Sequence, residues 1–162
     1  ESGGGQSGIT AGSAGERESG WPRDNKERKV RRAAARGQQH TGACLSIQPG
    51  RNRAAPFEIV DIIGAGGADL SRVIMCHIDV RLRAPEERLR LAQTGCYLEY
   101  DVFGWEGHFP SYWTADDFMD MPNDTQRIYE ILALMEAGHL DQILVSQDIC
   151  RKSTREIGRA HV

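Results

Sequence analysis

The chain carries side chains suited to metal binding and acid–base chemistry directly after short apolar runs. These positions are Gln48, His77, Asp101 and Asp148, and Glu16 joins them if residues 11–15 form a further, poor strand. Histidine, aspartate and glutamate gathered at one mouth are the ligand types of a hydrolytic zinc site. The same residues also have an ordinary interpretation, because a histidine at a strand end is often structural and an aspartate there often caps the next helix. The spacing alone leaves both interpretations open.

The apolar runs that precede these residues predict strands, and helical patterns lie between them. Strands are expected at residues 43–47, 72–76, 96–100 and 143–146. Helices are expected from about 56 to 66, from 85 to about 95, and after Asn123 or Asp124 as the N-cap. Strands that alternate with amphipathic helices form βαβ units on a parallel sheet, so the predicted class is α/β. Ligands bind such sheets outside the carboxyl ends of the strands.

Two helices can be described more closely from their apolar spacing. From Asn25 onward a very basic helix is expected to bury a narrow stripe, which consists of Val30, Ala33, Ala34 and Gly37. The helix that follows Asn123 is expected to bury Ile128, Ile131, Leu132 and Met135, and to end at Gly138. The first twenty residues, rich in glycine and serine, are typical of a flexible linker.

Composition excludes several classes of function. The 162 residues allow one domain, and a net charge of −3 gives no electrostatic reason to bind nucleic acid or an anionic membrane. No apolar run approaches the length of a membrane span, and the first residues lack the features of a signal peptide, so a cytoplasmic protein is expected. Four cysteines, none in a CxxC pair, predict buried free thiols and argue against a zinc–thiolate site.

Five segments together resemble the phosphotriesterase family of the metal-dependent amidohydrolase superfamily. In order, they resemble its strands four to eight: residues 8–16 (GITAGSAGE), 46–51 (SIQPGR), 73–79 (VIMCHID), 95–104 (GCYLEYDVFG) and 143–149 (ILVSQDI). The resemblance runs from about Glu1 to Arg155. A glutamate at position 16, where organophosphate-degrading relatives carry a carboxylated lysine, indicates the phosphotriesterase-related branch.

The resemblance implies a fold and an activity. Residues 1–156 would form part of a (β/α)8 barrel, its second half, and residues 157–162 would be a non-native tail. Intact relatives hold two divalent metal ions, usually zinc, around a bridging hydroxide. By resemblance Glu16 bridges the metals, His77 ligates one, and Asp148 binds metal and shuttles the proton. Asp101 would bind substrate, which is an ester, lactone or amide, with N-acyl amides favoured.

The sequence departs from the family pattern in two ways. Gln48 stands where the fifth strand of the family presents a histidine, and a neutral amide oxygen is a weak metal ligand. The HxH pair of the first strand is absent, since no two of the five histidines are separated by one residue. Strands one to three have no counterpart in the sequence. We therefore expect the chain by itself to be inactive.

Two further features have a functional and a structural interpretation each. Arg51, just past the expected fifth strand, could clamp a carboxylate or sulfonate of a small-molecule substrate, or it could be a solvated loop residue. The loop from 102 to about 122 carries aromatic residues that could form a lid or could simply fold onto the barrel. They are Phe103, Trp105, Phe109, Tyr112 and Trp113.

Two other classes of function remain as alternatives. One is a non-catalytic barrel remnant, which metal analysis would identify. The other is a nucleic-acid-binding protein that uses the basic residues around the first helix. These are Arg23, Lys26, Arg28, Lys29, Arg31, Arg32 and Arg36. No aromatic residues interleave them, which disfavours nucleic-acid binding.

Overall fold

Five parallel strands form one sheet, and their order in space is their order along the chain. The computed structural model describes residues 13–16, 25–109 and 119–149. Across the sheet the strands are β1 (Ser13–Glu16), β2 (Cys44–Ile47), β3 (Val73–Met75), β4 (Tyr97–Tyr100) and β7 (Ile143–Val145). Every neighbouring pair is parallel. The predicted α/β class with a parallel sheet is confirmed.

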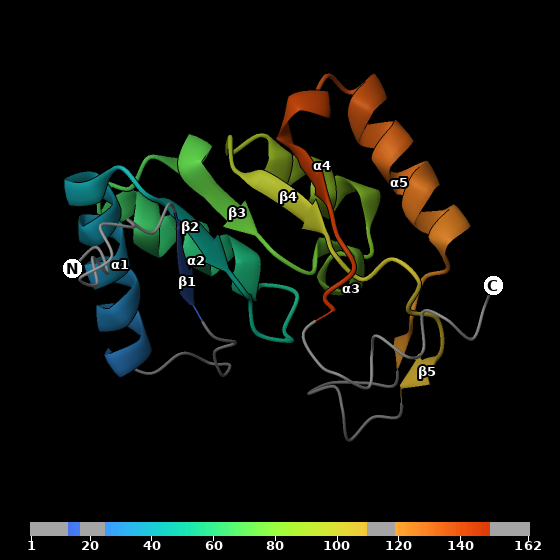
Figure 1. Ribbon diagram of the computed structural model, residues 1–162, viewed down its shortest axis with the longest axis horizontal. Helices are drawn as coiled ribbons and strands as arrows, with labels where there is room; N and C mark the ends of the chain where they lie inside the picture. The colour runs from blue at the N-terminus through green and yellow to red at the C-terminus, as the bar shows by residue number, and fades with distance from the viewer. Residues whose placement is uncertain (1–12, 17–24, 110–118, 150–162) are drawn as a thin grey trace, which may run out of the picture.

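Helices make the crossovers that parallel strands require. They are α1 (Asn25–Thr41), α2 (Ala55–Ala65), α4 (Pro85–Ala92) and α5 (Asp124–Glu136). Shorter elements are η1 (Leu70–Arg72), α3 (Ile78–Arg81), η3 (Leu140–Gln142) and the antiparallel pair β5 (His108–Phe109) and β6 (Met119–Asp120). Figure 1 shows the sheet in the centre, with α1 and α5 at opposite sides.

The central strands have one buried face and one half-buried face. Leu45 and Ile47 of β2 are buried and alternate with the half-buried Ser46, because successive side chains of a strand point to opposite faces. In β4, Leu98 and Tyr100 are buried and Glu99 is half-buried. The buried face forms one cluster with residues of the helices, and each large side chain there contributes about 1.5–3 kcal/mol. The other face, which carries Ser46 and Glu99, is half-buried.

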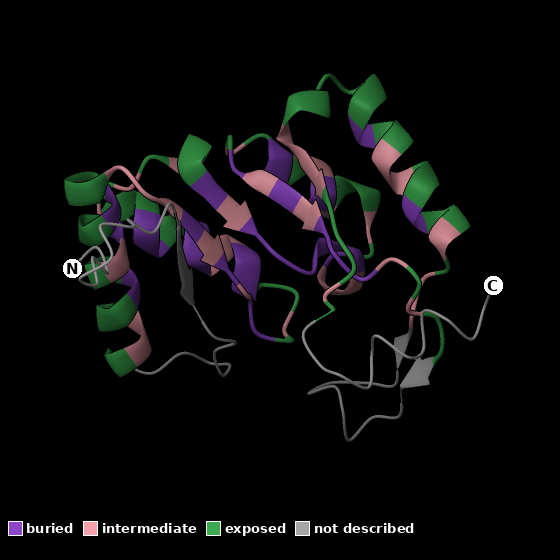
Figure 2. Cartoon of the chain, in the orientation of Figure 1, coloured by how far each residue is buried: buried purple, intermediate pink, exposed green. Residues whose placement is uncertain are grey.

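The start and end of α5 follow the sequence prediction, but its buried stripe does not. Asn123 caps the helix by accepting a hydrogen bond from the Gln126 amide, at 2.9 Å, and Gly138 follows the helix with φ of 89°. The predicted stripe is wrong, since Ile128, Leu132 and Met135 are exposed and only Ile131 is half-buried. The buried positions are Arg127 and Leu134, and most of the α5 ribbon carries the colours of exposed or intermediate residues in Figure 2. The spacing of apolar residues could not predict which face of α5 is buried. The rotation of the helix is fixed by Arg127, a buried charged residue that an apolar pattern leaves out.

The predicted stripe of α1 is also largely wrong, since Val30, Ala33 and Gly37 are exposed and only Ala34 is half-buried and packs against the core. Arg31, Ala35 and Gln38 are buried, at spacing i, i+4 and i+7, whereas Val30 is 59% exposed. Gln38 explains the rotation of the helix, because its amide reaches the turn before β3. Its Nε2 donates to the carbonyl oxygens of Asp69 and Arg72, at 3.1 and 3.2 Å, and its Oε1 accepts from the Asp69 amide at 2.7 Å.

Some of the basic residues of α1 interact with other parts of the protein. Arg28 forms an ion pair with Glu58 of α2, and burial lowers the pKa of Arg31 to about 10. A helix whose arginines contact a neighbouring helix has fewer charges to offer to a phosphate backbone. The nucleic-acid alternative gains no support from this arrangement.

Two substitutions on α1 test which face is docked. Ala35→Glu should destabilise the protein by roughly 3 kcal/mol or more, since it buries a charge at a fully buried position. Val30→Glu should change the free energy of unfolding by no more than about 0.5 kcal/mol. Urea unfolding monitored by circular dichroism measures both. A larger loss for Val30→Glu than for Ala35→Glu would mean that the stripe expected from the sequence is the docked one.

Candidate metal-binding site at the carboxyl ends of the strands

A polar pocket of about 230 Å³ opens at the carboxyl ends of β2, β3, β4 and β7. Its lining contains three of the sequence-predicted site residues that follow a strand, His77, Asp101 and Asp148, together with Gln48. The remaining lining residues are Ser46, Cys76, Glu99 and Ser146. The sheet therefore brings together side chains that lie far apart in the sequence, from Ser46 to Asp148.

Strand register explains why these side chains share one face. Ile47 pairs with Met75, and Met75 pairs with Leu98. The next residue of each strand, which points to the opposite face, then falls in one row that consists of Gln48, Cys76 and Glu99. A hydrogen bond from the Cys76 amide to the Ile47 carbonyl, at 3.0 Å, extends the pairing to this row.

His77 is turned into the pocket by an unusual backbone conformation. It follows β3 with φ of 58° and ψ of 33°, the left-handed region, which non-glycine residues seldom adopt. Asp101 stabilises this turn, because its carboxylate accepts the His77 amide at 3.1 Å and contacts the ring Nδ1 at 2.7 Å. This carboxylate–imidazole contact orients the ring and leaves Nε2 for a ligand, as in many metal-binding histidines.

The surroundings of His77 favour its protonated form. Burial by itself would lower the pKa of the imidazole, but the hydrogen bond and charge of Asp101 outweigh it. Asp148 also raises this pKa through its charge. The net direction is upward from the ordinary value. Asp101 is thus a partner of His77, and its direct contact with a substrate stays a prediction.

Replacing Asp101 tests the origin of this shift. In metal-free protein, Asp101→Asn should lower the His77 pKa, because the amide keeps hydrogen bonds but removes the charge. A raised histidine pKa adds stability that is fully present below the unfolded pKa, about 6.5, and is lost as pH rises through the folded value. The variant should lack this loss. NMR titration of the His77 ring measures the pKa, and an unchanged value would exclude Asp101 as its cause.

Asp148 lies in the same pocket on the far side from β2. It follows β7, whose pairing with β4 continues to Ser146 through a hydrogen bond from the Ser146 amide to the Tyr100 carbonyl, at 2.9 Å. The backbone of Asp148 also adopts a positive φ, 44°. Two residues with positive φ, His77 and Asp148, therefore line one pocket, which is where strained conformations are commonly found.

Cys76 and Glu99 also line the pocket, although the sequence analysis did not predict them as site residues. A sulfur or oxygen atom from each of Cys76, Glu99 and Asp101 lies within 4.8 Å of the others. Burial raises the pKa of the Cys76 thiol to about 12, and Glu99 adds to the shift. The Cys76 sulfur also lies 3.3 Å from the Ser46 hydroxyl. The sequence did not indicate this cluster, because a short motif such as CxxC shows only ligands that are close in the chain. Cys76 follows β3, whereas Glu99 and Asp101 belong to β4 and the residue after it.

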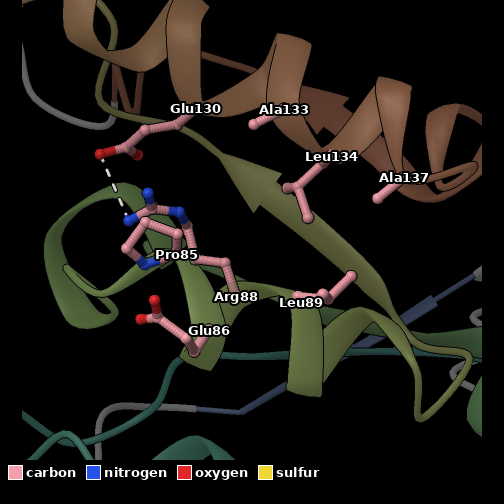
Figure 3. Close-up of a pocket in the computed structure, with 8 residues that line it drawn as sticks. All are labelled: Pro85, Glu86, Arg88, Leu89, Glu130, Ala133, Leu134 and Ala137. Carbon is pink, nitrogen blue, oxygen red and sulfur yellow. Dashed lines mark ion pairs between the residues drawn. The ribbon is translucent and has the colours of Figure 1, made fainter.

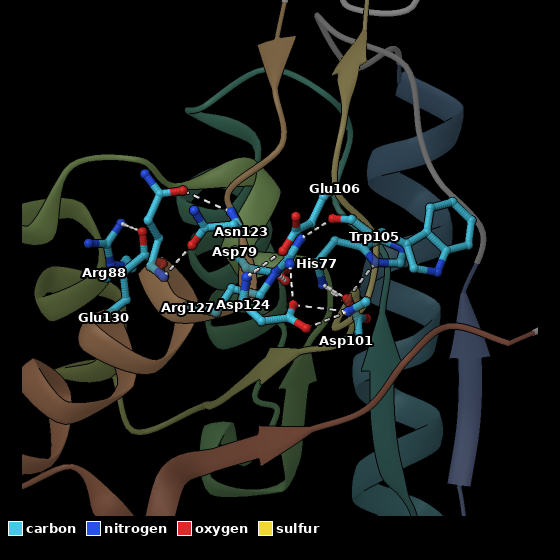
Figure 4. A network of polar contacts seen from close by, with 12 residues as sticks. His77, Asp79, Arg88, Asp101, Trp105, Glu106, Asn123, Asp124, Arg127 and Glu130 are labelled. Carbon is cyan, nitrogen blue, oxygen red and sulfur yellow. Dashed lines mark hydrogen bonds and ion pairs between the residues drawn. The ribbon is translucent and has the colours of Figure 1, made fainter. Parts of the chain in front are cut away.

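A buried ionic network fixes the loop behind the pocket (Figure 4). The fully buried Arg127 of α5 donates from Nε to Asp79 at 2.9 Å, from Nη1 to Asp124 at 2.6 Å, and from Nη2 to the Trp105 carbonyl at 2.7 Å. Asp124 in turn accepts the Gly104 amide at 2.9 Å. Burial and then the charge of Asp101 raise the pKa of Asp79 to about 6, against the opposing effect of Arg127.

The other predicted residues are placed less completely. Glu16 is the last residue of β1 and pairs with Ile47, but its side chain lies outside what the structure describes. Arg51 is exposed on the loop after β2, outside the lining of the pocket. In the aromatic loop, Phe103 and Trp105 are half-buried. Cys76 and Cys96 are buried free thiols as predicted, whereas Cys44 is a free thiol that is only half-buried. Several predicted features lie outside the described residues: Cys150, Tyr112, Trp113, the side chain of Phe109, most of the expected linker and the expected tail at 157–162.

A second pocket lies away from the strand ends, between α4 and α5 (Figure 3). Its wall is mostly apolar and includes Leu89, Ala133 and Leu134. Arg88 contacts Glu130 there at 3.3 Å, and burial raises the pKa of Glu130 to about 7. This groove has one ion pair and no convergent set of metal ligands among the described residues. The polar pocket at the strand ends is therefore the candidate functional site.

Comparison with known proteins identifies the family. The model of the phosphotriesterase family matches residues 1–161, so the chain belongs to the phosphotriesterase family. Human N-acetyltaurine hydrolase is 43% identical over 145 residues, which are 90% of this chain and 41% of that protein. The chain thus spans about two-fifths of the length of this relative.

Solved structures support the same assignment. The phosphotriesterase homology protein of Escherichia coli, crystallised with phosphate in its active site, matches 94% of this chain and 48% of its own, with a TM-score of 0.72 and 25% identity. A resiniferatoxin-binding protein of Rhodobacter sphaeroides matches 78% of this chain and 34% of its own, with a TM-score of 0.67 and 34% identity. The five-stranded α/β sheet is part of the barrel of this family.

Among the described residues, no helix is both long and apolar enough to cross a membrane.

Proposed function

We propose that this chain supplies strands four to eight of a zinc-dependent hydrolase that cleaves N-acyl amides of small molecules. The observation that carries the proposal is the shared pocket of His77 and Asp148, in which Asp101 fixes the His77 ring through a 2.7 Å contact. The names of the relatives, N-acetyltaurine hydrolases, support an amide substrate.

The donor set of the pocket fits a divalent cation. His77 presents one nitrogen because Asp101 holds the other, and Asp148 adds a carboxylate from the end of β7, two strands away in the same sheet. Glu16, at the end of β1, is proposed as a further ligand. Gln48 offers a neutral oxygen only, so binding of a second ion at that side would be weak. These residues alone do not complete two ligand sets.

The chemistry assigned to this chain is ligand positioning and proton transfer. Bound zinc would lower the pKa of a coordinated water and polarise the substrate carbonyl. Asp148 would accept a proton from the attacking water and deliver it to the departing amine nitrogen, as a general base and then a general acid. Asp101 would keep the His77 ring in one orientation during these steps.

Substrate recognition is proposed to use the rim of the pocket. N-acetyltaurine, the substrate named for the relatives, carries a sulfonate, and the guanidinium fork of Arg51 suits such an anion. Arg51 lies on the loop that directly follows Gln48, at the same end of the sheet as the pocket. A small anionic N-acyl amide could then place its carbonyl near His77 and Asp148.

The proposal is tested with this chain alone and with a fusion that adds strands one to three of a relative. The fusion joins the amino-terminal part of the human relative to residues 1–156. With added zinc, the fusion should hydrolyse N-acetyltaurine, whereas this chain alone should show no turnover because its ligand sets are incomplete. Within the fusion, Asp148→Asn should lower kcat at least about 100-fold.

Matched variants separate chemistry from folding. Cys44→Ser changes a thiol on β2 outside the pocket lining and should leave kcat unchanged. Arg51→Lys should raise KM for the sulfonate substrate with little change in kcat, since the charge remains and the fork is lost. Full activity of the Asp148→Asn fusion, or zinc-dependent turnover by this chain alone as a folded monomer, would refute the proposed roles.

A further inference from the structure

We infer that Cys76, Glu99 and Asp101 form a thiolate–carboxylate cation site that selects thiophilic divalent ions such as zinc, cobalt and cadmium. The inference rests on the proposed function to the extent that the site lies in the same pocket. It adds a ligand type, a cysteine sulfur, that the resemblance to the family does not assign. It also predicts which ions the pocket prefers.

The backbone places the three groups together independently of side-chain conformation. Cys76 and Glu99 directly follow the paired residues Met75 and Leu98, so both leave neighbouring strands side by side on the polar face. Asp101 lies two residues beyond Glu99 on the same face. Its Oδ1 contacts the His77 ring, and the remaining lone pairs of the carboxylate can bind an ion while this contact is kept. Cys76 is the residue between the end of β3 and the left-handed turn at His77, and its amide still donates to the Ile47 carbonyl of β2.

The distances match one bound ion after small side-chain movements. The three ligand atoms lie within 4.8 Å of one another. Zinc bonds of about 2.3 Å to sulfur and about 2.0 Å to oxygen, in tetrahedral geometry, put ligand atoms about 3.5 Å apart. A contraction of about 1 Å would therefore close the set around one ion. Gln48 lies next to Cys76 in the same row and lines the same pocket.

The charge of the pocket points to a cation as well. Glu99, Asp101 and Asp148 contribute three carboxylates to its lining, which includes no lysine or arginine among the described residues. Cys76 contributes a sulfur that is 92% buried, since its exposed fraction is 8%. On binding, the ion would replace the thiol proton, which leaves to water, and the resulting thiolate would favour soft and borderline ions over magnesium or calcium.

Cobalt(II) absorption tests the inference directly on the full chain. Reduced protein is titrated with cobalt, and bound metal is counted by equilibrium dialysis. A near-ultraviolet sulfur-to-cobalt charge-transfer band should grow to saturation at one ion per chain. Cys76→Ser should abolish the band and weaken binding about tenfold or more, and Glu99→Gln should weaken binding by a similar factor while the band remains at saturation.

Controls make each outcome decisive. Cys44→Ser should keep the band, and excess magnesium should not displace cobalt, whereas cadmium should. Cobalt bound without a charge-transfer band, with His77→Asn or Asp148→Asn reducing that binding, would overturn the cysteine ligand and leave the proposed hydrolase site standing. No bound cobalt in a protein with wild-type circular dichroism would overturn the cation site and weigh against the metal dependence of the proposed function.

Discussion

The buried guanidinium of Arg127 is the contact on which the arrangement of the site depends. It joins α5 to Asp79 in the short helix after His77 and to the Trp105 carbonyl in the loop after β4. Removing one partner of a buried ion pair typically costs 3–5 kcal/mol, because the remaining charge is left uncompensated. The network therefore holds the two segments that carry His77 and Asp101 at a fixed separation, which the contact between them requires.

The same constraint explains features of α5 that hydrophobicity does not. Because Arg127 points inward, Leu134, two turns further, is buried, and Ile128 and Leu132 are exposed. Asp124, at the start of the helix, binds both Arg127 and the Gly104 amide. One helix thus sets the position of the loop after β4, while the strands set the row of side chains inside the pocket.

Sequence patterns predicted the elements well and the contacts between them poorly. Local sequence patterns predicted the strands, the cap at Asn123 and the polar residues at strand ends, because each of these depends on residues that are close in the chain. The rotations of α1 and α5 could not be predicted in this way, since the buried Gln38 and Arg127 are polar and their partners are 31 and 48 residues away. Cys76 was missed for the same reason, as its partner Glu99 lies on another strand.

Hydrogen exchange of single amides in Arg127→Met measures most directly whether this network holds the pocket. The His77 amide, accepted by Asp101, and the Gly104 amide, accepted by Asp124, should exchange about tenfold faster or more. The Gly66 amide, which donates to Ile62 in α2, should exchange at its original rate. Arg127→Lys should give an intermediate result, because it keeps the charge without the fork. Unchanged exchange at His77 and Gly104, or an equal increase at Gly66, would contradict the account.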